Sequence, residues 1–476
     1  NAGANSEKLE IQMLEAENLE KIGNGKAKTI VKPIEKFDVV IGNPPFIRYQ
    51  NFPEAHRALA IKMMQDLGLK PNKLTNIWVP FLVISASLLK ENGKLGMVIP
   101  TELFQVKYAG ETRVFLSKFF SRITIIAFKK LVFKGIQQEV VLLLCEKEVK
   151  SDKGIRVFEL DYLDELKSID FESISDNKVK SIDHSTEKWT KYFLEEDEIK
   201  VLREIKDSKK IPIARDILDV DVGIVTGRNK FFMMKESQVS LWKLEKHTRK
   251  VVSKSNQLKG IEFSDNDFKT NKNLGYPVHL FLPPKEDFSK LPKKCQDYIK
   301  YGEEQEFHTG YKCRIRKRWY ITPSLWQPKG FALRQIHLYP KLILNHTEAM
   351  STDTVHRMKF LSKEYSPEDI VICFLNSLTF AFSEITGRSY GGGVMTFEPT
   401  EIEALPIPVM KNHGINLSEI DALMRNNEIE KVLDIVDKKV LIDHYGFSSD
   451  EVKSFRKIWI RLSNRRINRG KSARSK

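Results

Sequence analysis

Cysteine is scarce in this sequence, and its scarcity excludes two ways of stabilising a fold. The four cysteines, at positions 145, 295, 313 and 373, lie far apart, and no pair has CxxC spacing. A zinc site or a disulfide framework needs closer or more numerous cysteines, so we expect neither a metal nor disulfides. Cys145 and Cys373 stand in apolar runs, which is typical of core residues.

Long hydrophobic runs are also lacking. No apolar stretch approaches the roughly 18 residues that a membrane-spanning helix needs, so no membrane partner is expected. The chain starts Asn1-Ala2-Gly3-Ala4, without Met and without the charged-then-apolar layout of a secretion signal. We therefore expect a cytoplasmic protein whose N-terminal part is missing from this sequence.

Negative charge is in the minority. The 63 Asp and Glu residues face 78 Lys and Arg residues, which gives a net charge of +15 over 476 residues. Such an excess favours a polyanionic partner, because each cation placed at a phosphate releases a condensed counterion. A solvated basic surface explains the charge equally well, so charge alone leaves nucleic acid and no partner both open.

The first part of the chain alternates strand-like and helix-like segments. The apolar run Phe37–Ile41 ends at Gly42 and suits a strand covered on both faces, as in a parallel sheet. The following segments are, in order, a helix over 76–92, a strand over 94–99, a helix over 111–120 and strands over 123–128 and 140–145. This order predicts an α/β sheet with an antiparallel hairpin at its edge.

The rest of the chain has a different pattern. The stretch 150–185 is polar and is expected to be a linker, whereas 211–408 has short elements typical of an α+β domain. Within it we expect strands at 220–225 and 342–344 and a helix over 370–382. Residues 416–462 have helical periodicity and precede a basic, disordered tip. The expected domains are therefore 1–150, a linker 151–190, a second domain 191–410 and a helical basic tail 411–476.

Asn43-Pro44-Pro45-Phe46 is the segment with the clearest chemistry. Ligands of open α/β sheets bind beyond the carboxyl ends of strands, where this segment stands. The Asn43 side-chain oxygen and the Pro44 carbonyl make two acceptors for the two hydrogens of an exocyclic amine. Drawing those hydrogens out of the ring plane localises the nitrogen lone pair and makes the nitrogen nucleophilic. Phe46 offers a face on which a base that has left its duplex can stack. The alternative is a tight, proline-rich turn with Phe46 in the core.

The sequence resembles the gamma-class adenine-N6 DNA methyltransferases of type II restriction–modification systems, which carry their own target-recognition domain. Three segments of the first domain carry the resemblance: FDVVIGNPPFIRY, LTNIWVPFLVISASLLKENGKLGMVIPTELF and LVFKGIQQEVVLLL. It implies a Rossmann-like methyltransferase sheet, amine binding by Asn43 and Pro44, and stacking of the flipped base between Phe46 and Phe133. Phe133 is otherwise a hairpin core residue.

The second domain resembles the family's target-recognition domain. Asp221–Phe232 resembles its opening segment, which includes Arg228, and Ser389–Pro408 its closing segment. Gly391, Gly392 and Gly393 allow a backbone to approach a phosphate or another chain closely, or else form a flexible loop. The stretch KCRIRKRWY interleaves aromatics with the cations Lys312, Arg314, Arg316 and Arg318, which suits double-stranded DNA; an ordinary exposed strand explains the alternation as well.

The sequence departs from the family at the cofactor site. The resemblance implies S-adenosyl-L-methionine, held by a Gly-rich loop after a first strand, and nothing before Asn43 provides that loop. Glu17 and Asn18 are candidates for the adenine contact, although both also suit an ordinary helix end. We therefore expect the first strands of the sheet to be missing, either removed or supplied by another chain.

Two rival functions stay open. A chain without a cofactor loop suits a DNA-binding specificity module that has no catalysis of its own. The Asn-Pro-Pro-aromatic turn also occurs in protein glutamine methyltransferases, but the basic charge and the long region after the hairpin favour DNA. An upstream nuclease would fit a single-chain restriction–modification enzyme, and the sequence contains no convincing nuclease motif.

Overall fold

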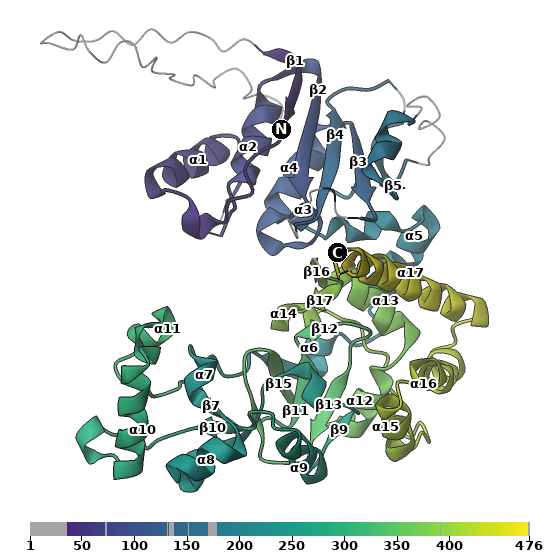
Figure 1. Ribbon diagram of the computed structural model, residues 1–476. Coiled ribbons are helices and arrows are strands. Elements are labelled where there is room, and N and C mark those ends of the chain that lie inside the picture. The colour runs from purple at the N-terminus through teal and green to yellow at the C-terminus, as the bar shows by residue number, and fades with distance from the viewer. Residues whose placement is uncertain are drawn as a thin grey trace, which may run out of the picture. The chain divides into compact units, whose positions relative to one another are not determined.

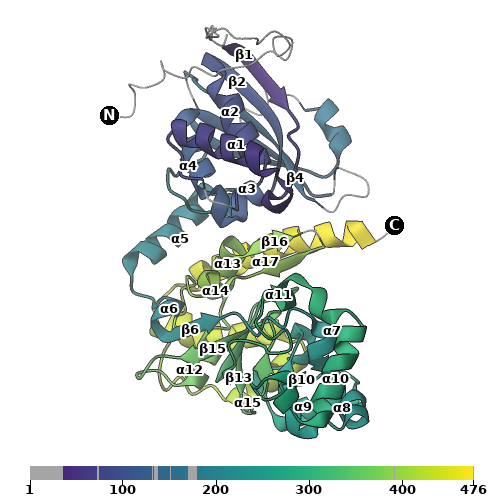
Figure 2. The ribbon, with the colours of Figure 1, turned by 90° about the vertical axis from the view of Figure 1, so that its left-hand side faces the viewer.

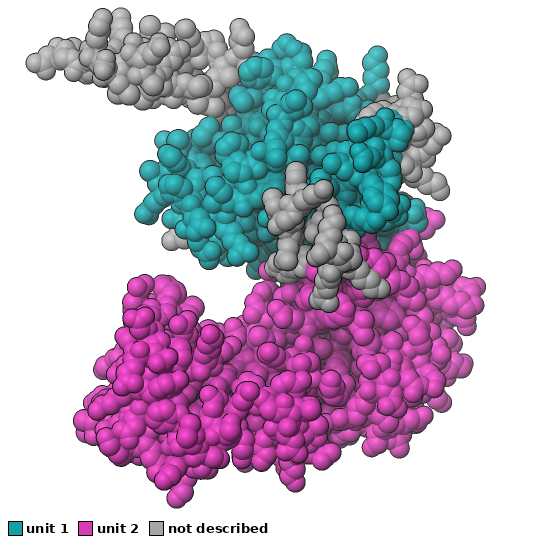
Figure 3. All heavy atoms as spheres, viewed as in Figure 1, with its two compact units in different colours: residues 1–196 teal, residues 197–476 magenta. Residues whose placement is uncertain are grey.

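The structure is a computed structural model of the full chain. It describes residues 36–71, 74–130, 132, 138–150, 152–169, 179–390 and 392–474. The chain divides into two compact units, residues 1–196 and 197–476, which Figure 3 colours separately.

The described residues of unit 1 form a five-stranded mixed sheet with the strand order β1-β2-β4-β3-β5. β1 runs parallel to β2, β4 runs antiparallel to both of its neighbours, and β5 runs parallel to β3. The elements, drawn in Figure 1, are β1 (Phe37–Gly42), α1 (Glu54–Asp66), α2 (Trp78–Ser87), β2 (Leu89–Pro100), α3 (Glu102–Gln105), α4 (Gly110–Phe119), β3 (Arg122–Phe128), β4 (Val140–Glu146) and β5 (Gly154–Leu160).

Helix α2 anchors the core of unit 1. It is apolar nearly all round, and Trp78, Val79, Leu82 and Val83 are completely buried. A helix of this composition needs protein on several sides. α2 packs against β2 on one side and against α1 and α4 on others, so these helices cover one face of the sheet (Figure 2).

Strand β1 is exposed along one face. Phe37, Val39 and Ile41 alternate along this strand and are 48%, 57% and 80% exposed. Among the described residues β1 pairs with β2 alone, so one edge of the strand is also open. The expected parallel pairing is confirmed, but the described residues do not supply the expected cover on both faces.

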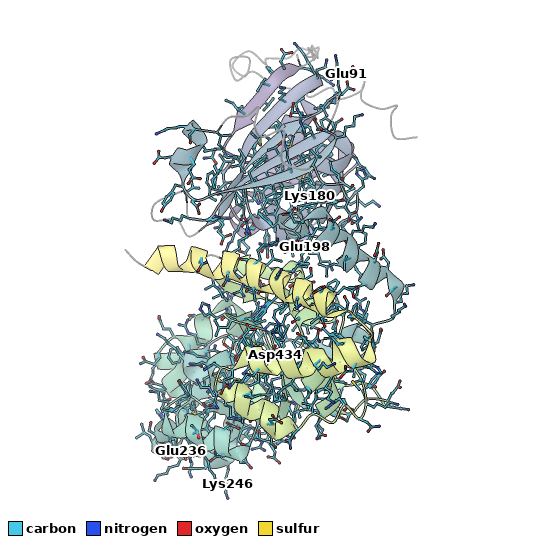
Figure 4. The ribbon with its side chains drawn as sticks, turned by 90° about the vertical axis from the view of Figure 1, so that its right-hand side faces the viewer. Glu91, Lys180, Glu198, Glu236, Lys246 and Asp434 are labelled. Carbon is cyan, nitrogen blue, oxygen red and sulfur yellow. The ribbon has the colours of Figure 1, made fainter. Side chains whose placement is uncertain are left out.

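Strand β5 corrects two expectations. It lies in the stretch 150–185 that was expected to be a linker, and it pairs with β3 over its full length. The hairpin of β3 and β4 is therefore not at the edge of the sheet, because β5 lies outside it. The segment that follows is tied in as well: Lys180, labelled in Figure 4, exchanges backbone hydrogen bonds with Ile155 and donates from Nζ to the Tyr192 carbonyl at 2.8 Å.

In the part of unit 2 that the structure describes there are three mixed or antiparallel sheets with short strands, consistent with the short elements expected there. Their strand orders are β14-β8-β10-β7, β6-β15-β11-β13-β9 and β12-β17-β16. The strands are β6 (Leu218–Asp221), β7 (Met233–Met234), β8 (Thr248–Val252), β9 (Glu262–Phe263), β10 (His279–Phe281), β11 (Gly330–Leu333), β12 (Gln335–Ile336), β13 (Leu342–Asn345), β14 (Met350–Ser351), β15 (Val355–Phe360), β16 (Arg388–Tyr390) and β17 (Val394–Thr396).

Helices surround these sheets. They are α5 (Glu196–Ser208), α6 (Ala214–Ile217), α7 (Asn229–Phe232), α8 (Glu236–Trp242), α9 (Asp265–Asn273), α10 (Lys293–Glu304), α11 (Tyr311–Arg314), α12 (Pro367–Cys373), α13 (Ser377–Thr386), α14 (Pro399–Ile402), α15 (Leu417–Arg425), α16 (Ile429–Val436), a π-helix (Asp437–His444) and α17 (Ser449–Arg474). All four cysteines of the chain are buried, which confirms the core positions expected for Cys145 and Cys373.

The single helix expected over 370–382 is wrong. Asn376 interrupts it: its side chain accepts from the Thr379 backbone N–H and donates to the Cys373 carbonyl, which ends α12 and starts α13. The two helices meet at a bend of 76°. Among the described residues no single helix is long and apolar enough to cross a membrane. By length and composition alone, the bent pair α12 and α13 together would suit a membrane-crossing segment.

The C-terminal helices belong to the core of unit 2. α17 packs along α13, with Ile458 and Trp459 buried, and it continues to Arg474. The basic tip was expected to be disordered, but Arg466 is buried and pairs with the buried Glu384 at 2.7 Å. Nearer the start of α17, Arg456 pairs with Asp434, labelled in Figure 4, at 2.6 Å.

Candidate active site

Asn43–Phe46 lie directly beyond the carboxyl end of β1, as the sequence predicted. Asn43 and Pro45 are exposed, Phe46 is half-buried and Pro44 is buried. Asn43 forms no hydrogen bond to another described residue, so its amide oxygen is available as an acceptor. The two candidate acceptors and the candidate stacking ring are thus contiguous, and two of the four residues face solvent.

The end of this loop is held from behind by Asn76. The Asn76 amide oxygen accepts from the Tyr49 backbone N–H at 3.1 Å, and the Ile77 N–H donates to the Ile47 carbonyl at 3.1 Å. Asn76 is buried at the start of helix α2. These bonds fix the backbone one and three residues after Phe46, and neither of them engages Asn43.

Glu102 and Tyr108 complete a polar network around Asn76. The Asn76 amide donates to Glu102 Oε2 at 3.0 Å and to the Tyr108 hydroxyl at 2.8 Å, and Tyr108 donates to Glu102. Burial, and then the charge of Glu102, raise the pKa of the Tyr108 phenol, which therefore acts as a hydrogen-bond donor. Sequence reasoning missed this network; a polar Asn76 beside an otherwise apolar helix was its only local signal.

Four candidate residues lie outside the described part of the chain. They are the stacking candidate Phe133, the cofactor candidates Glu17 and Asn18, and Gly391. Among the described residues, no group of three or more His, Cys, Asp and Glu side chains is placed to hold a metal ion.

The stretch Lys312–Tyr320 is not a strand, so the exposed-strand alternative is wrong. It begins in helix α11 and continues in turns. Arg316 donates to the carbonyls of Thr226 and Val225 at 2.7 and 2.6 Å, and Arg318 pairs with Asp287. At least one cation of this stretch therefore has a structural role, because Arg316 donates to a backbone carbonyl 90 residues away in the sequence.

Lys312, Arg314 and Arg228 remain exposed. Helix α11 lies close against the turn that carries Arg228. Gly227 in this turn has φ +83°, and a Cβ atom at this position would lie only 2.9 Å from the Lys312 Cβ. The structure therefore brings Lys312 and Arg228 into one region although they are far apart in sequence.

The glycine loop makes its close approach to α17. A side chain at Gly393, which has φ +77°, would meet the Ile467 backbone at 3.1 Å, and the Gly393 carbonyl accepts from Arg466 at 2.6 Å. Gly392 has φ +97° and open space around its Cα. The close approach of Gly393 is thus to a helix of the same chain, and contact of these glycines with a phosphate or another chain stays a prediction.

Two known protein families match most of the chain. Residues 186–441, more than half of the chain, match the family described as "Type II methyltransferase M.Eco57I, C-terminal domain", and residues 3–133 match the "Eco57I restriction-modification methylase" family. The chain therefore belongs to the methyltransferases of type II restriction–modification systems, as the resemblance predicted.

Individual relatives of the chain are type II methyltransferases as well. The chain is 24% identical to the type II methyltransferase M.AccI of Acinetobacter calcoaceticus, over 77% of this chain and 68% of the relative. It is 27% identical to M.HindII of Haemophilus influenzae, over 64% of this chain and 58% of the relative. The DNA-bound type IIL enzyme MmeI shares the fold, with a TM-score of 0.51 and 12% identity, over 90% of this chain and 57% of that one. The chain thus spans about 57–68% of the lengths of these three proteins.

Proposed function

We propose that the protein to which this chain belongs transfers a methyl group from S-adenosyl-L-methionine to N6 of an adenine flipped out of duplex DNA. One observation carries the proposal. Asn43–Phe46 follow the carboxyl end of a parallel strand with Asn43 exposed and unpaired, while Asn76 holds the backbone that comes after them. A turn that served only to connect β1 to α1 would not need an unpaired amide beside a buried polar anchor.

The chemistry follows from the two acceptors. Asn43 Oδ1 and the Pro44 carbonyl each accept one hydrogen of the adenine amine, and the lone pair of N6 is released from the ring for attack on an electrophilic methyl group. These hydrogen bonds strengthen as the nitrogen becomes positive in the transition state, so they accelerate the reaction more than they tighten binding. Phe46 stacks on the extruded base.

The cofactor site needs more than the described residues provide. S-adenosyl-L-methionine supplies the methyl group when bound, but none of the described strands is followed by a Gly-rich turn with a carboxylate placed for a ribose. The open edge and the exposed face of β1 support a sheet that continues past β1. We propose that the added strands carry the cofactor loop.

Unit 2 is proposed to be the target-recognition domain. Its matched family segment, its cluster of exposed cations around Arg228 and Lys312, and the net charge of +15 support contact with DNA phosphates. The proposed arrangement is thus a Rossmann-like catalytic unit followed by an α+β recognition unit that ends in helices.

The test is methyl transfer by a version of the protein that includes the cofactor loop. Duplex DNA is incubated with S-adenosyl-L-methionine labelled in the methyl group, digested to nucleosides and analysed for N6-methyladenine by mass spectrometry. Asn43→Ala should lower kcat about a hundredfold or more and leave DNA affinity unchanged, because phosphate contacts dominate binding. Asn51→Ala is the matched control, since Asn51 is exposed in the same loop region.

Phe46→Ala separates stacking from chemistry. The ring contributes about 1–3 kcal/mol of stacking, so the variant should lower the flipped population as well as the rate. Fluorescence of 2-aminopurine at the target position reports flipping directly. Label on cytosine or on protein, or full adenine methylation by Asn43→Ala, would contradict the proposal.

A DNA-binding specificity module without catalysis is the second candidate. It is favoured by the lack of a cofactor loop among the described residues. Calorimetry of this chain with S-adenosyl-L-methionine should give weak or no binding. A micromolar dissociation constant would place a complete cofactor site within the chain and count against the module.

A further inference from the structure

Unit 2 has a cleft of about 700 Å³ whose lining is unusual in composition. It lies where α7, β7 and the start of α8 meet the turn after β8, with β12 on another side. Lysines, side-chain amides and hydroxyls line it together with Tyr301 and Phe307, and no carboxylate does so among the described residues.

Three lysines project from this lining. Lys230, Lys235 and Lys254 are exposed, and none of them forms an ion pair with a described residue. Some other lysines of the unit do form such pairs; Lys250 with Asp265 and Lys272 with Glu236, which Figure 4 labels, are examples. Three uncompensated cations around one cleft create a local positive potential that suits a polyanion.

Side-chain amides stand between these cations. Gln335 is exposed at the start of β12, and its side-chain amide forms no hydrogen bond to a described residue. Gln238 uses its oxygen to accept from the Lys235 N–H, and Asn256 donates to the Tyr276 hydroxyl at a long 3.4 Å. The amide of Gln335 presents a donor and an acceptor side by side, which matches the N6 and N7 edge of adenine in the major groove; Gln238 keeps its amide N–H groups and Asn256 its oxygen for further contacts.

Two aromatic residues of the lining, Tyr301 and Phe307, connect the cleft to the candidate DNA-binding residue Arg228. Phe307 and Tyr301 are partly buried, and the Arg228 guanidinium lies 5.4 Å from the centre of the Phe307 ring. Arg228 in turn neighbours Lys312 across Gly227. The cations flanking the cleft therefore extend beyond it along the surface, as a contact with a long backbone requires.

We infer that this cleft reads the base sequence of duplex DNA. Lys230, Lys235 and Lys254 contact phosphates and set the register, while Gln238, Asn256 and Gln335 contact base edges and set the specificity. The inference rests on the proposed function, and it assigns to the cleft the choice of the DNA site that is methylated.

The experiment uses this chain and a pool of 30-base-pair duplexes with a randomised centre. Bound duplexes are recovered and sequenced, and affinity for the selected duplex and for a scrambled one is measured between 50 and 200 mM salt. Gln335→Ala and Gln238→Ala should each relax the preference at a subset of positions by roughly tenfold, and leave the salt slope unchanged. Removing Lys230, Lys235 and Lys254 together should weaken binding to both duplexes and lower the slope by about 0.9 for each phosphate that is no longer neutralised.

The matched control removes the same charge elsewhere. Lys246 (labelled in Figure 4), Lys269 and Lys290 are exposed, lie outside the cleft lining and form no ion pair with a described residue. Their triple alanine variant should keep most of the slope and all of the sequence preference. Thermal unfolding should be nearly unchanged in the lysine variants and in Gln335→Ala, whose side chains are exposed and unpaired, whereas Gln238→Ala should be slightly less stable because it loses the bond from the Lys235 N–H at the start of α8.

The outcomes separate the inference from the proposed function. If the unaltered chain binds duplexes without sequence preference, or if the glutamine variants select the same sequence as strongly, the cleft does not read bases. The same conclusion follows if the cleft and control lysine variants have equal slopes. If the unaltered chain binds no duplex at all, the proposed DNA function of unit 2 fails along with the inference.

Discussion

Substitution of Asn76 tests whether the candidate catalytic loop depends on the network behind it. Asn76→Ala removes three hydrogen bonds, to the Tyr49 N–H, the Tyr108 hydroxyl and the Glu102 carboxylate. Neutral bonds contribute about 1 kcal/mol each and a bond to a carboxylate about 1.5–3 kcal/mol. Glu102 and Tyr108 are only half-buried and retain each other as partners. We therefore expect a loss of about 2–3 kcal/mol in the free energy of unfolding.

The effect on catalysis should exceed the effect on folding. Without Asn76 the Tyr49 N–H loses its anchor, and the loop that carries Asn43 samples a wider range of positions. Misplacement of a reacting group by about 1 Å costs up to a hundredfold in rate, so kcat for adenine methylation should fall at least tenfold in enzyme that is still folded. DNA affinity should change little.

Three comparisons make the Asn76 result interpretable. Tyr108→Phe removes the hydroxyl's bonds to Asn76, Glu102 and Trp78 Nε1 and keeps the bonds from Asn76 to Tyr49 and Glu102. It should therefore cost about 2–3 kcal/mol and preserve kcat. Asn76→Asp keeps the acceptor for the Tyr49 N–H but places a second carboxylate beside Glu102. The two negative charges repel each other, so the free energy of unfolding of this variant should rise as pH falls and one carboxylate is protonated. Urea unfolding and kcat would be measured for each variant. If Asn76→Ala behaved like the exposed control Asn51→Ala in both assays, the network would not position the loop.

Three further predictions concern unit 2. Arg314→Ala should lower the salt slope of DNA binding by about 0.9, whereas Arg318→Ala, which loses its pair with Asp287, should leave the slope unchanged; equal slopes would contradict this. Arg466→Met should cost about 3–5 kcal/mol of unfolding free energy in urea, because it strands a buried Glu384, and replacing both residues by apolar ones should restore most of it. Burial lowers the pKa of Lys341 to about 7, so the unfolded chain binds more protons between pH 7 and 10.5 and stability should rise across that window; Lys341→Met should flatten the profile.

The sequence predicted the fold of unit 1 best where strands are short and apolar. β1, β3 and β4 lie within one or two residues of their expected positions, because a run of branched apolar residues between polar turns has few alternatives. β5 was missed because Gly154–Leu160 contains two charged side chains and a glycine, and its place is decided by pairing with β3. Pairing of this kind is a tertiary effect that local composition does not contain.

Apolar length was a poorer guide in unit 2. The run over 370–382 has the composition of one helix, and only the buried side chain of Asn376 decides that it becomes two. The C-terminal region has the charge of a solvated tail, but Arg466 is directed into the core, where Glu384 and backbone carbonyls satisfy it. A charged residue is predicted to be exposed unless its partner is known, and this partner is 82 residues away.

The same distinction separates the parts of the candidate site. Asn43–Phe46 could be found from the sequence because the chemistry needs contiguous residues after a strand. Glu102 and Tyr108 are 26 and 32 residues away from Asn76, so the network of the three exists only in the folded chain. The cations of Lys312–Tyr320 looked equivalent in the sequence, and only the fold distinguishes Arg316, bonded to backbone carbonyls, from the exposed Arg314.

The geometry of the loop also indicates when the proposed site becomes reactive. An acceptor pair that takes both hydrogens of an amine has to be unsatisfied before the base arrives, and a buried unsatisfied amide would cost about 1–3 kcal/mol. Asn43 avoids that cost because it is exposed to water. Water weakens the same hydrogen bonds, however, so the full effect on N6 requires that the base and its surroundings exclude solvent from Asn43. The rigid backbone at Ile47–Tyr49 keeps the acceptor in place during this exchange, and a base that fails to enter leaves the site hydrated and inactive.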